Sequence, residues 1–224
     1  AELEAALTDF GAKPFHARQI YQWMYRRAVA DFSRMTDLSL KLRARLDKAL
    51  VISTPVIAHT QRSADGTVKF LIRLRDNLHV EAVFIPETPA MTFCISTQVG
   101  CAMQCGFCLT GKMGLARNLT AGEIVAQVRI MAHALDMADR RFNIVLMGMG
   151  EPLHNYDATM KALRILAAAS GFAVPPRRMT LSTVGVLPAL ERLAAEPLMP
   201  NLAVSLHATT EEMRDQLVPI NRKY

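Results

Sequence analysis

Residues 92–108 read TFCISTQVGCAMQCGFC, an apolar run of the strand type that leads directly into a loop with three cysteines. The loop cysteines are Cys101, Cys105 and Cys108, and the chain has only one other, Cys94. A cubane iron–sulfur cluster normally takes four cysteine ligands, so three of them leave one iron open. An open metal position is typical of catalytic sites, whereas structural sites are closed. The spacing therefore favours a metal site that performs chemistry at the end of a strand.

Two other interpretations of the cysteines stay open at this point. Zinc needs four ligands, and Cys94 could supply the fourth only if the chain folded back from its strand onto the loop. The cysteines could also be small buried hydrophobes gathered by chance. The first ten residues are acidic and do not form a secretory signal. We therefore expect a reducing, cytoplasmic environment, in which structural disulfides are rare.

From residue 91 onward the pattern alternates between strands and helices. The predicted strands cover 91–99, 142–148, 178–185 and 201–208, and the helices between them cover 120–138, 157–170 and 186–196. Thr120 and Glu123 form a capping box at the start of the first helix. Repeated βα units predict a parallel sheet or barrel of the α/β class, with a site built by loops at the carboxyl ends of the strands.

Alternation along the strands indicates which side chains face the site, because successive side chains point to opposite faces. The small or polar faces carry Cys94, Ser96 and Gln98 on the first strand, and Ser182, Ser205 and His207 on later strands. A purely structural parallel sheet is more often apolar on both faces. The pattern therefore predicts that the polar faces line a functional cavity.

The residues before the cysteine strand have a different character. Their predicted helices and strands cover 13–28, 37–50, 67–76 and 79–87, with the two strands forming a small antiparallel sheet. We place a boundary at PETPA, residues 86–90. It divides a helical and β-hairpin accessory domain (1–89) from the core domain (90–224).

The net charge of +6 is concentrated in the early helices. Residues 11–50 carry nine Lys and Arg side chains against three Asp. Such a patch suits a polyanionic partner such as RNA. The same charges are also typical of a solvated helix surface, and charge alone does not separate the two. No apolar run approaches the roughly 20 residues that span a bilayer, so no membrane partner is expected.

The sequence resembles the RlmN/Cfr family of radical S-adenosyl-L-methionine (SAM) RNA adenine methyltransferases, most closely its RlmN branch. The motifs that carry the resemblance are TFCISTQVGCAMQCGFC, LMGMGEPLHNYD, LSTVG and AVSLHATTEEMRDQLVPINRKY. The resemblance implies a partial radical SAM (β/α) barrel with about four βα units after the accessory domain. It also implies two cofactors, a [4Fe–4S] cluster and SAM, and an electron donor such as flavodoxin.

By match with the family motifs, the resemblance assigns roles to the candidate residues. It implies that Cys101, Cys105 and Cys108 hold the cluster. The residues implied to contact SAM are Gly150, Glu151, Ser182, Ser205, Leu206 and His207. Glu81 matches the family's proton acceptor. Cys94 matches a cysteine outside the cluster that helps to remove the ring proton while a disulfide forms with a methyl-carrying cysteine.

The implied function is methylation of carbon 2 of an adenosine in 23S rRNA and in tRNA. Methylation at carbon 8, as in Cfr, is the alternative within the family. Outside the family, the alternative is a non-catalytic RNA-binding module whose four cysteines hold a metal. The family's carrier cysteine lies later in the chain, and no cysteine follows Cys108 here. We therefore expect an amino-terminal portion of a longer protein, inactive on its own and prone to self-association.

Overall fold

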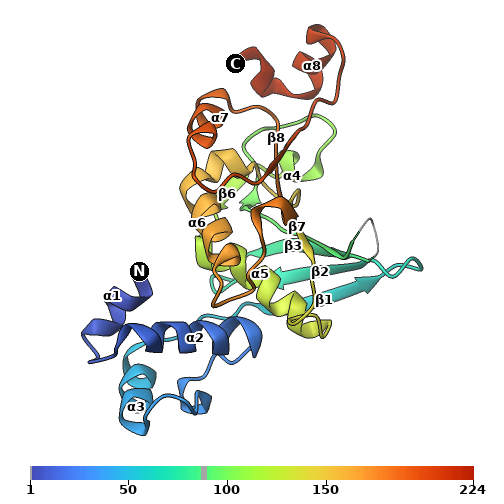
Figure 1. Cartoon of the computed structure of the whole chain (residues 1–224). Coiled ribbons are helices and arrows are strands. Elements are labelled where there is room, and N and C mark those ends of the chain that lie inside the picture. Colours follow the sequence, from blue (N-terminus) through green and yellow to red (C-terminus); the bar gives the residue numbers. More distant parts are fainter. Residues whose placement is uncertain (1, 87–89) are drawn as a thin grey trace.

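The computed structural model describes residues 2–86 and 90–224, and most of its strands form one mixed sheet (Figure 1). The strands of this sheet lie in the order β1-β2-β3-β4-β7-β8-β9. They are β1 (Val56–Arg62), β2 (Val68–Arg73), β3 (His79–Ile85), β4 (Thr92–Cys94), β7 (Asn143–Leu146), β8 (Met179–Thr183) and β9 (Asn201–Val204). Pairing is antiparallel from β1 to β4 and parallel from β4 through β7 and β8 to β9.

The parallel half of the sheet confirms the predicted α/β fold. Its helices are α5 (Ala121–Ala134), α6 (Tyr156–Ala167) and α7 (Leu187–Ala194). At the start of α5, the Glu123 N–H donates to Thr120 Oγ1 at 3.2 Å, and the Thr120 N–H donates to the Glu123 carboxylate at 2.9 Å. The predicted capping box is therefore present. Because these strands are parallel, the loops that follow them gather at one edge of the sheet.

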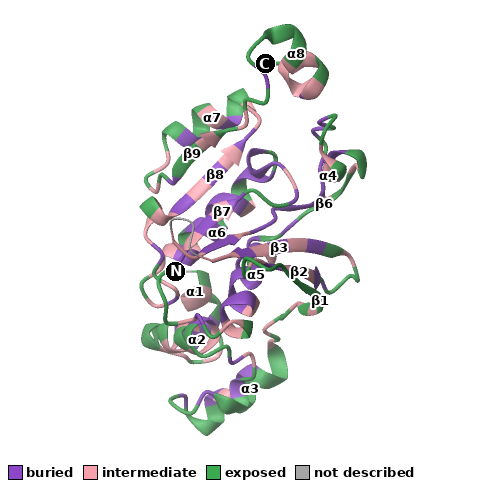
Figure 2. Ribbon diagram, turned by 90° about the vertical axis from the view of Figure 1, so that its right-hand side faces the viewer, coloured by how far each residue is buried: buried purple, intermediate pink, exposed green. Residues whose placement is uncertain are grey.

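One face of the sheet packs against α5 and α6 and forms the main hydrophobic core (Figure 2). Phe93, Ile144 and Met179 lie in register on three neighbouring strands, and all three are fully buried. They share one core cluster with Ile124 of α5 and Leu163 of α6.

The other face of the parallel strands is less covered. Cys94, Val145 and Thr180 lie in register on this face, and each is only half-buried. The predicted division into an apolar face and a more open face holds for β4 and β8, whereas on β9 the apolar Leu202 and Val204 are exposed.

The run predicted as the first strand of the core is not one strand. β4 ends at Cys94, and the next strand, β5 (Gln98–Gly100), pairs with β6 (Leu115–Asn118) in a separate two-stranded sheet. Between them, the Gln127 side chain accepts from the Ser96 N–H and donates to the Ser96 carbonyl, both at 2.9 Å. These bonds replace those of a strand ladder. The alternation predicted beyond Cys94 is therefore wrong, and Ser96, Thr97 and Gln98 are all buried.

The two strands predicted before the boundary, β2 and β3, are present and continue the core sheet. β3 pairs with β4, with Phe84 opposite Phe93. A third strand, β1, escapes prediction because its sequence VIAHTQR lacks alternation and nearly all of it is exposed. Part of the predicted boundary, residues 87–89, lies outside the described residues. The division into two domains stays a prediction.

The amino-terminal region is a group of helices with its own core (Figure 1). It comprises α1 (Glu2–Thr8), α2 (Pro14–Arg26), η1 (Phe32–Arg34) and α3 (Leu40–Ala49). Leu42 and Leu46 of α3 are buried in that core. Arg26 attaches this region to the rest of the chain. Its Nε donates to the Gly171 carbonyl at 3.0 Å and its Nη2 to the Ala169 carbonyl at 3.1 Å.

After β9 the chain forms α8 (Glu211–Leu217) and η4 (Pro219–Arg222), at the opposite end of the molecule from the amino-terminal helices (Figure 1). The remaining short elements are α4 (Leu109–Lys112), η2 (Pro152–Asn155) and η3 (Pro176–Arg178). Of the helices in the described ranges, none is both long and apolar enough to cross a membrane.

Candidate cofactor site

The three loop cysteines lie between β5 and α4, in a loop shaped by glycine and backbone hydrogen bonds. Gly100 has φ +76°, and a Cβ there would lie 1.8 Å from the Gly114 carbonyl oxygen, so only glycine fits. Cys101 donates its N–H to the same carbonyl at 2.9 Å. The Cys108 N–H donates to the Cys105 carbonyl at 3.0 Å and closes a tight turn between these two ligand candidates.

The three cysteines share one small hydrophobic cluster. Cys101 and Cys105 are buried, Cys108 is half-buried, and Val218 from the end of the chain is fully covered in the same cluster. Burial raises the pKa of the Cys101 and Cys105 thiols, and the nearby Cys108 raises both further. At neutral pH these thiols stay protonated unless a cation is present. A metal bound to sulfur supplies that positive charge.

This donor set suits a [4Fe–4S] cluster better than a single ion. Within the described ranges, no three His, Cys, Asp or Glu side chains converge closely enough to hold one metal ion. Each cysteine of a cubane cluster binds a different iron, so its ligands stand around the cluster instead of meeting at one point. Three thiols in one apolar cluster, beside a tight loop, fit that arrangement.

The loop after β7 approaches the cysteine loop through a glycine. Gly150 has φ +100°, and a Cβ there would lie 2.6 Å from the Gln98 Cβ. The next residue, Glu151, donates its N–H to Gln98 Oε1 at 2.8 Å. The close contact between these two loops therefore requires glycine at position 150.

Glu151 is a buried carboxylate beside the thiols. It is 3% exposed, and it accepts hydrogen bonds from the Leu153 and Val184 N–H groups, each at 3.0 Å. Burial raises the pKa of Glu151 despite these donors. Its charge contributes to the raised pKa of Cys101 and Cys105, which shows that the carboxylate lies near them. A buried carboxylate with lone pairs to spare favours a positively charged ligand, because such a ligand stabilises its ionised form.

Two serines meet at the carboxyl ends of the last two strands. Ser182 Oγ lies 3.0 Å from Ser205 Oγ, and both residues are half-buried. Ser205 lies just beyond β9, and its N–H donates to the Thr183 carbonyl at 2.8 Å, which extends the pairing of β8 with β9. The prediction that these two serines share a face is confirmed.

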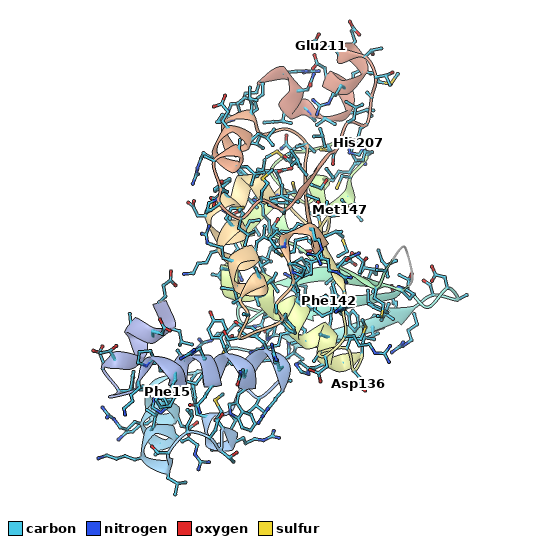
Figure 3. All side chains as sticks on the ribbon, in the orientation of Figure 1. Phe15, Asp136, Phe142, Met147, His207 and Glu211 are labelled. Atoms are coloured by element: carbon cyan, nitrogen blue, oxygen red, sulfur yellow. The ribbon has the colours of Figure 1, made fainter. Side chains whose placement is uncertain are left out.

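Leu206 and His207 follow this pair and are exposed. His207 lies beyond the strand, with φ +60°, so strand alternation does not apply to it. Its ring centroid lies 4.3 Å from that of Phe107, which precedes the last loop cysteine. The end of β9 thus reaches the cysteine loop. Figure 3 shows His207 near the α8 end of the molecule, above Met147.

Cys94 lies outside the cysteine cluster. On β4 it pairs in register with Val83 of β3 and Val145 of β7. Burial raises the pKa of its thiol to about 11, although the Met147 backbone N–H donates to the sulfur. The structure therefore does not bring Cys94 to the loop, which argues against a zinc site with four cysteines. All four cysteines are free thiols, and the disulfide implied by the resemblance needs a partner outside this sequence.

Glu81 lies on the same face of the sheet as Cys94, because it is two positions along β3 from Val83. Its carboxylate pairs with Lys69 Nζ at 3.1 Å, and the two side chains are 47% and 44% exposed. The predicted proton acceptor is thus part of an open ion pair on the less covered face of the sheet.

Several more polar side chains organise the site, and most of them carry only a weak sequence signal or none. Gln98 Nε2 donates to Asn118 Oδ1 at 2.7 Å and lies 3.1 Å from His154 Nδ1. Arg214 of α8 donates to backbone carbonyls in the loops after β8 and β9, at 2.6 and 3.2 Å. In the sequence, Arg214 stands among acidic residues of a short helix and is typical of a solvated surface. His154 lies inside the quoted motif LMGMGEPLHNYD, which is its only signal.

Two family models match the chain. The ribosomal RNA large subunit methyltransferase N-terminal domain matches residues 1–52, and the radical SAM superfamily matches residues 95–224. The dual-specificity RNA methyltransferase RlmN of Rhodospirillum rubrum is 50% identical over 230 residues, which cover 100% of this chain and 54% of that protein. The protein of the same name from Nautilia profundicola is 45% identical over 235 residues, covering 99% of this chain and 66% of that protein.

A solved structure is also similar. The crystal structure of a radical SAM methyltransferase from Sphaerobacter thermophilus matches with a TM-score of 0.92 and 47% sequence identity. The match covers 100% of this chain and 66% of that one. The chain thus spans between about half and two thirds of the length of these relatives.

Proposed function

The chain belongs to the RlmN family of the radical SAM superfamily, and on that premise we propose that it is part of an enzyme that methylates RNA with SAM. Membership implies a [4Fe–4S] cluster and SAM as cofactors. One observation supports the proposal most directly. Three clustered thiols, a buried carboxylate held by the loop after β8, and a serine pair all lie toward the carboxyl ends of the parallel strands. Active sites of βα barrels lie at that end.

In this proposal Cys101, Cys105 and Cys108 hold the cluster through their sulfur atoms. When bound, the cluster and SAM supply the one-electron chemistry of the reaction. The chain contributes the surroundings. Val218 is fully covered against the cysteines and excludes water from one side of the loop. We also propose a partner protein that supplies electrons, such as flavodoxin.

We also propose the assignment of the SAM contacts, which are Gly150, Glu151, Ser182, Ser205, Leu206 and His207. Two backbone N–H groups hold the Glu151 carboxylate, whose remaining lone pairs suit an ammonium group. The serine hydroxyls offer both donors and acceptors, and they lie on the less covered face of the sheet. The His207 and Phe107 rings form an aromatic surface suited to a flat heterocycle.

The finer proposal concerns the RNA. The target is carbon 2 of an adenosine in 23S rRNA and in tRNA, with the enzyme in the cytoplasm. Glu81 accepts a proton, and Cys94 resolves a protein–RNA adduct through a disulfide with a carrier cysteine outside this sequence. The common face of Cys94 and Glu81 supports this pairing, because substrate on that face can contact both. Mass analysis of the modified nucleoside separates carbon 2 from carbon 8 methylation.

Anaerobic reconstitution with iron and sulfide tests the proposal, followed by low-temperature electron paramagnetic resonance of the reduced protein with and without SAM. We expect a [4Fe–4S] signal that changes when SAM is added. Cys94→Ala should leave the iron content unchanged, whereas Cys105→Ala should lose most of it. Loss of iron in Cys94→Ala would instead support the non-catalytic module with four cysteine ligands.

A further inference from the structure

Four arginines lie together at the end of the sheet opposite the cysteines. Arg140 and Arg141 directly precede β7, while Arg177 and Arg178 belong to η3, directly before β8. These strands are adjacent and parallel, with Ile144 opposite Met179, so their amino-terminal ends lie side by side. We call these four residues the arginine rim. Figure 3 places Phe142, which follows Arg141 in the chain, well below His207 and toward the amino-terminal helices.

The arginine rim surrounds one hollow. All four arginines line a cavity of about 250 Å³, together with Phe142 and Phe172. Arg177 and Arg178 also line a second cavity of about 430 Å³, where the polar neighbours are Thr92, Asn143, Thr180 and Asn201. Most of these groups can donate hydrogen bonds, and none of the described side chains lining either cavity is acidic.

The guanidinium groups of the rim are available to bind a ligand. Arg140, Arg141 and Arg177 are exposed and Arg178 is half-buried. In the part of the chain that the structure describes, none of the four guanidinium groups donates a hydrogen bond or forms an ion pair. By contrast, Arg117 is held by both Asp76 and Glu123.

The acidic groups near the rim do not neutralise it. Asp136 and Asp139 lie in the same loop as Arg140, and both are exposed. Among the described residues, neither is paired with an arginine of the rim. Even with both aspartates counted, two positive charges remain uncompensated beside the two cavities.

The rim adjoins the basic amino-terminal helices. The Phe172 ring lies 5.8 Å from the Phe142 ring and 5.6 Å from the Tyr25 ring of α2, measured between centroids. Arg26, beside Tyr25, bonds to two carbonyls of the loop that precedes η3. The next residue, Arg27, stacks on Trp23 at 4.2 Å. Positive charge therefore continues from the end of α2 to the amino-terminal ends of β7 and β8.

We propose that the arginine rim binds backbone phosphates of the RNA substrate, on the end of the sheet opposite the cofactor site. The inference rests on the proposed function, in that it takes RNA as the substrate. Guanidinium groups match the geometry of phosphate oxygens and can bind them in pairs. The basic surface extends from α2 over η3 to the start of β7. A single small anion would cover only part of it, whereas a chain of evenly spaced phosphates can follow its whole length. The rim thus anchors the substrate away from the reacting base.

Fluorescence anisotropy with a labelled, unmodified tRNA transcript tests the rim. The variants are Arg177→Gln/Arg178→Gln and Arg140→Gln/Arg141→Gln. The control Arg62→Gln/Arg73→Gln removes the same charge from exposed positions on β1 and β2. We expect each rim pair to weaken binding several-fold and to reduce the slope of log affinity against log salt by about one for each phosphate that is no longer bound. The control pair should change both quantities far less.

Several results would overturn the inference. Equal losses in the rim and control pairs would show a general effect of charge. Competition by inorganic phosphate at low concentration would indicate a small-anion site, and equal binding of polyglutamate would indicate an acidic protein partner. Native chain that binds tRNA while the rim variants bind equally well removes the inference alone. Native chain that does not bind tRNA removes the inference together with its premise. Thermal unfolding should be unchanged in all variants, because these side chains make no hydrogen bonds to the described residues.

Discussion

Burial of the Cys94 thiol raises the pH at which it becomes reactive. Its pKa is raised to about 11, from an ordinary value of 9.0, and the thiolate is the reactive form. At pH 8 we expect Cys94 to react with iodoacetamide about a hundredfold more slowly than the same residue in the unfolded chain. The rate should rise until about pH 11. Mass spectrometry of the alkylated peptide measures it, and a midpoint near the ordinary value would contradict the burial argument.

The same shift has a consequence for stability. The unfolded chain releases the Cys94 proton at lower pH than the folded chain does, so it binds fewer protons in the interval between 9.0 and about 11. The free energy of unfolding should therefore fall as the pH rises through that interval. Cys94→Ala is the control, because it removes this contribution.

Gly150 should tolerate substitution less well than Gly114, although both have positive φ. Alanine at 150 places a Cβ 2.6 Å from Gln98, whereas alanine at 114 meets nothing within 4 Å. The strained left-handed backbone alone costs about 1–2 kcal/mol, and overpacking adds about 1–3 kcal/mol. Urea unfolding of Gly150→Ala should show both costs, and Gly114→Ala only the first. Equal losses would mean that the two loops separate without cost.

At the scale of elements, the sequence predicts those parts of the fold that local patterns determine. The helix α5 follows from a capping box and an apolar stripe within its own residues. The parallel strands β7, β8 and β9 follow from short apolar runs between helices. The end of β4 does not follow from any local pattern. Gln127, far along the chain, supplies the hydrogen bonds that interrupt the strand. Strand β1 has no apolar alternation because most of it faces solvent.

The candidate site divides in the same way. Cysteine spacing identifies the loop, and strand alternation identifies the meeting of Ser182 with Ser205. Arg214 could not be found by either signal, since its partners are backbone carbonyls on two distant loops. The sequence places His207 on the polar face of a strand. The residue lies beyond β9 with a positive φ, so the strand geometry behind that prediction does not apply.

At the scale of the whole molecule, the two edges of the sheet differ. Strand β9 exposes 43% of Leu202 and 57% of Val204, whereas β1 exposes Val56 at its start and polar side chains over its last four positions. Unpaired apolar edges template association. We expect the chain to self-associate, and Leu202→Lys/Val204→Lys to shift it toward monomer in size-exclusion chromatography with light scattering. The control Thr60→Lys/Gln61→Lys on β1 should have little effect. A chain that is monomeric before substitution would contradict this expectation.

The two ends of the molecule carry different tasks in the proposed enzyme. The thiols, Glu151 and the serine pair lie at the carboxyl ends of the strands, near α8. The helices α1–α3 lie at the other end (Figure 1), and the arginine rim lies at the amino-terminal ends of β7 and β8. A large substrate that contacts both ends is held over the length of the sheet, so chemistry and anchoring can be altered separately by substitution.

The cover of the cysteine loop also sets an order of events during synthesis. Leu217 accepts a hydrogen bond from Gly106 at 2.9 Å, and Val218 closes the cluster around Cys101 and Cys105. The ribosome releases the cysteines long before it releases these two residues. On the nascent chain the thiols are therefore open to oxidants and to delivery of iron and sulfide, and the loop is sealed only when the later segment emerges. The loop is therefore more accessible to iron and sulfide before residues 217 and 218 pack against it than afterwards.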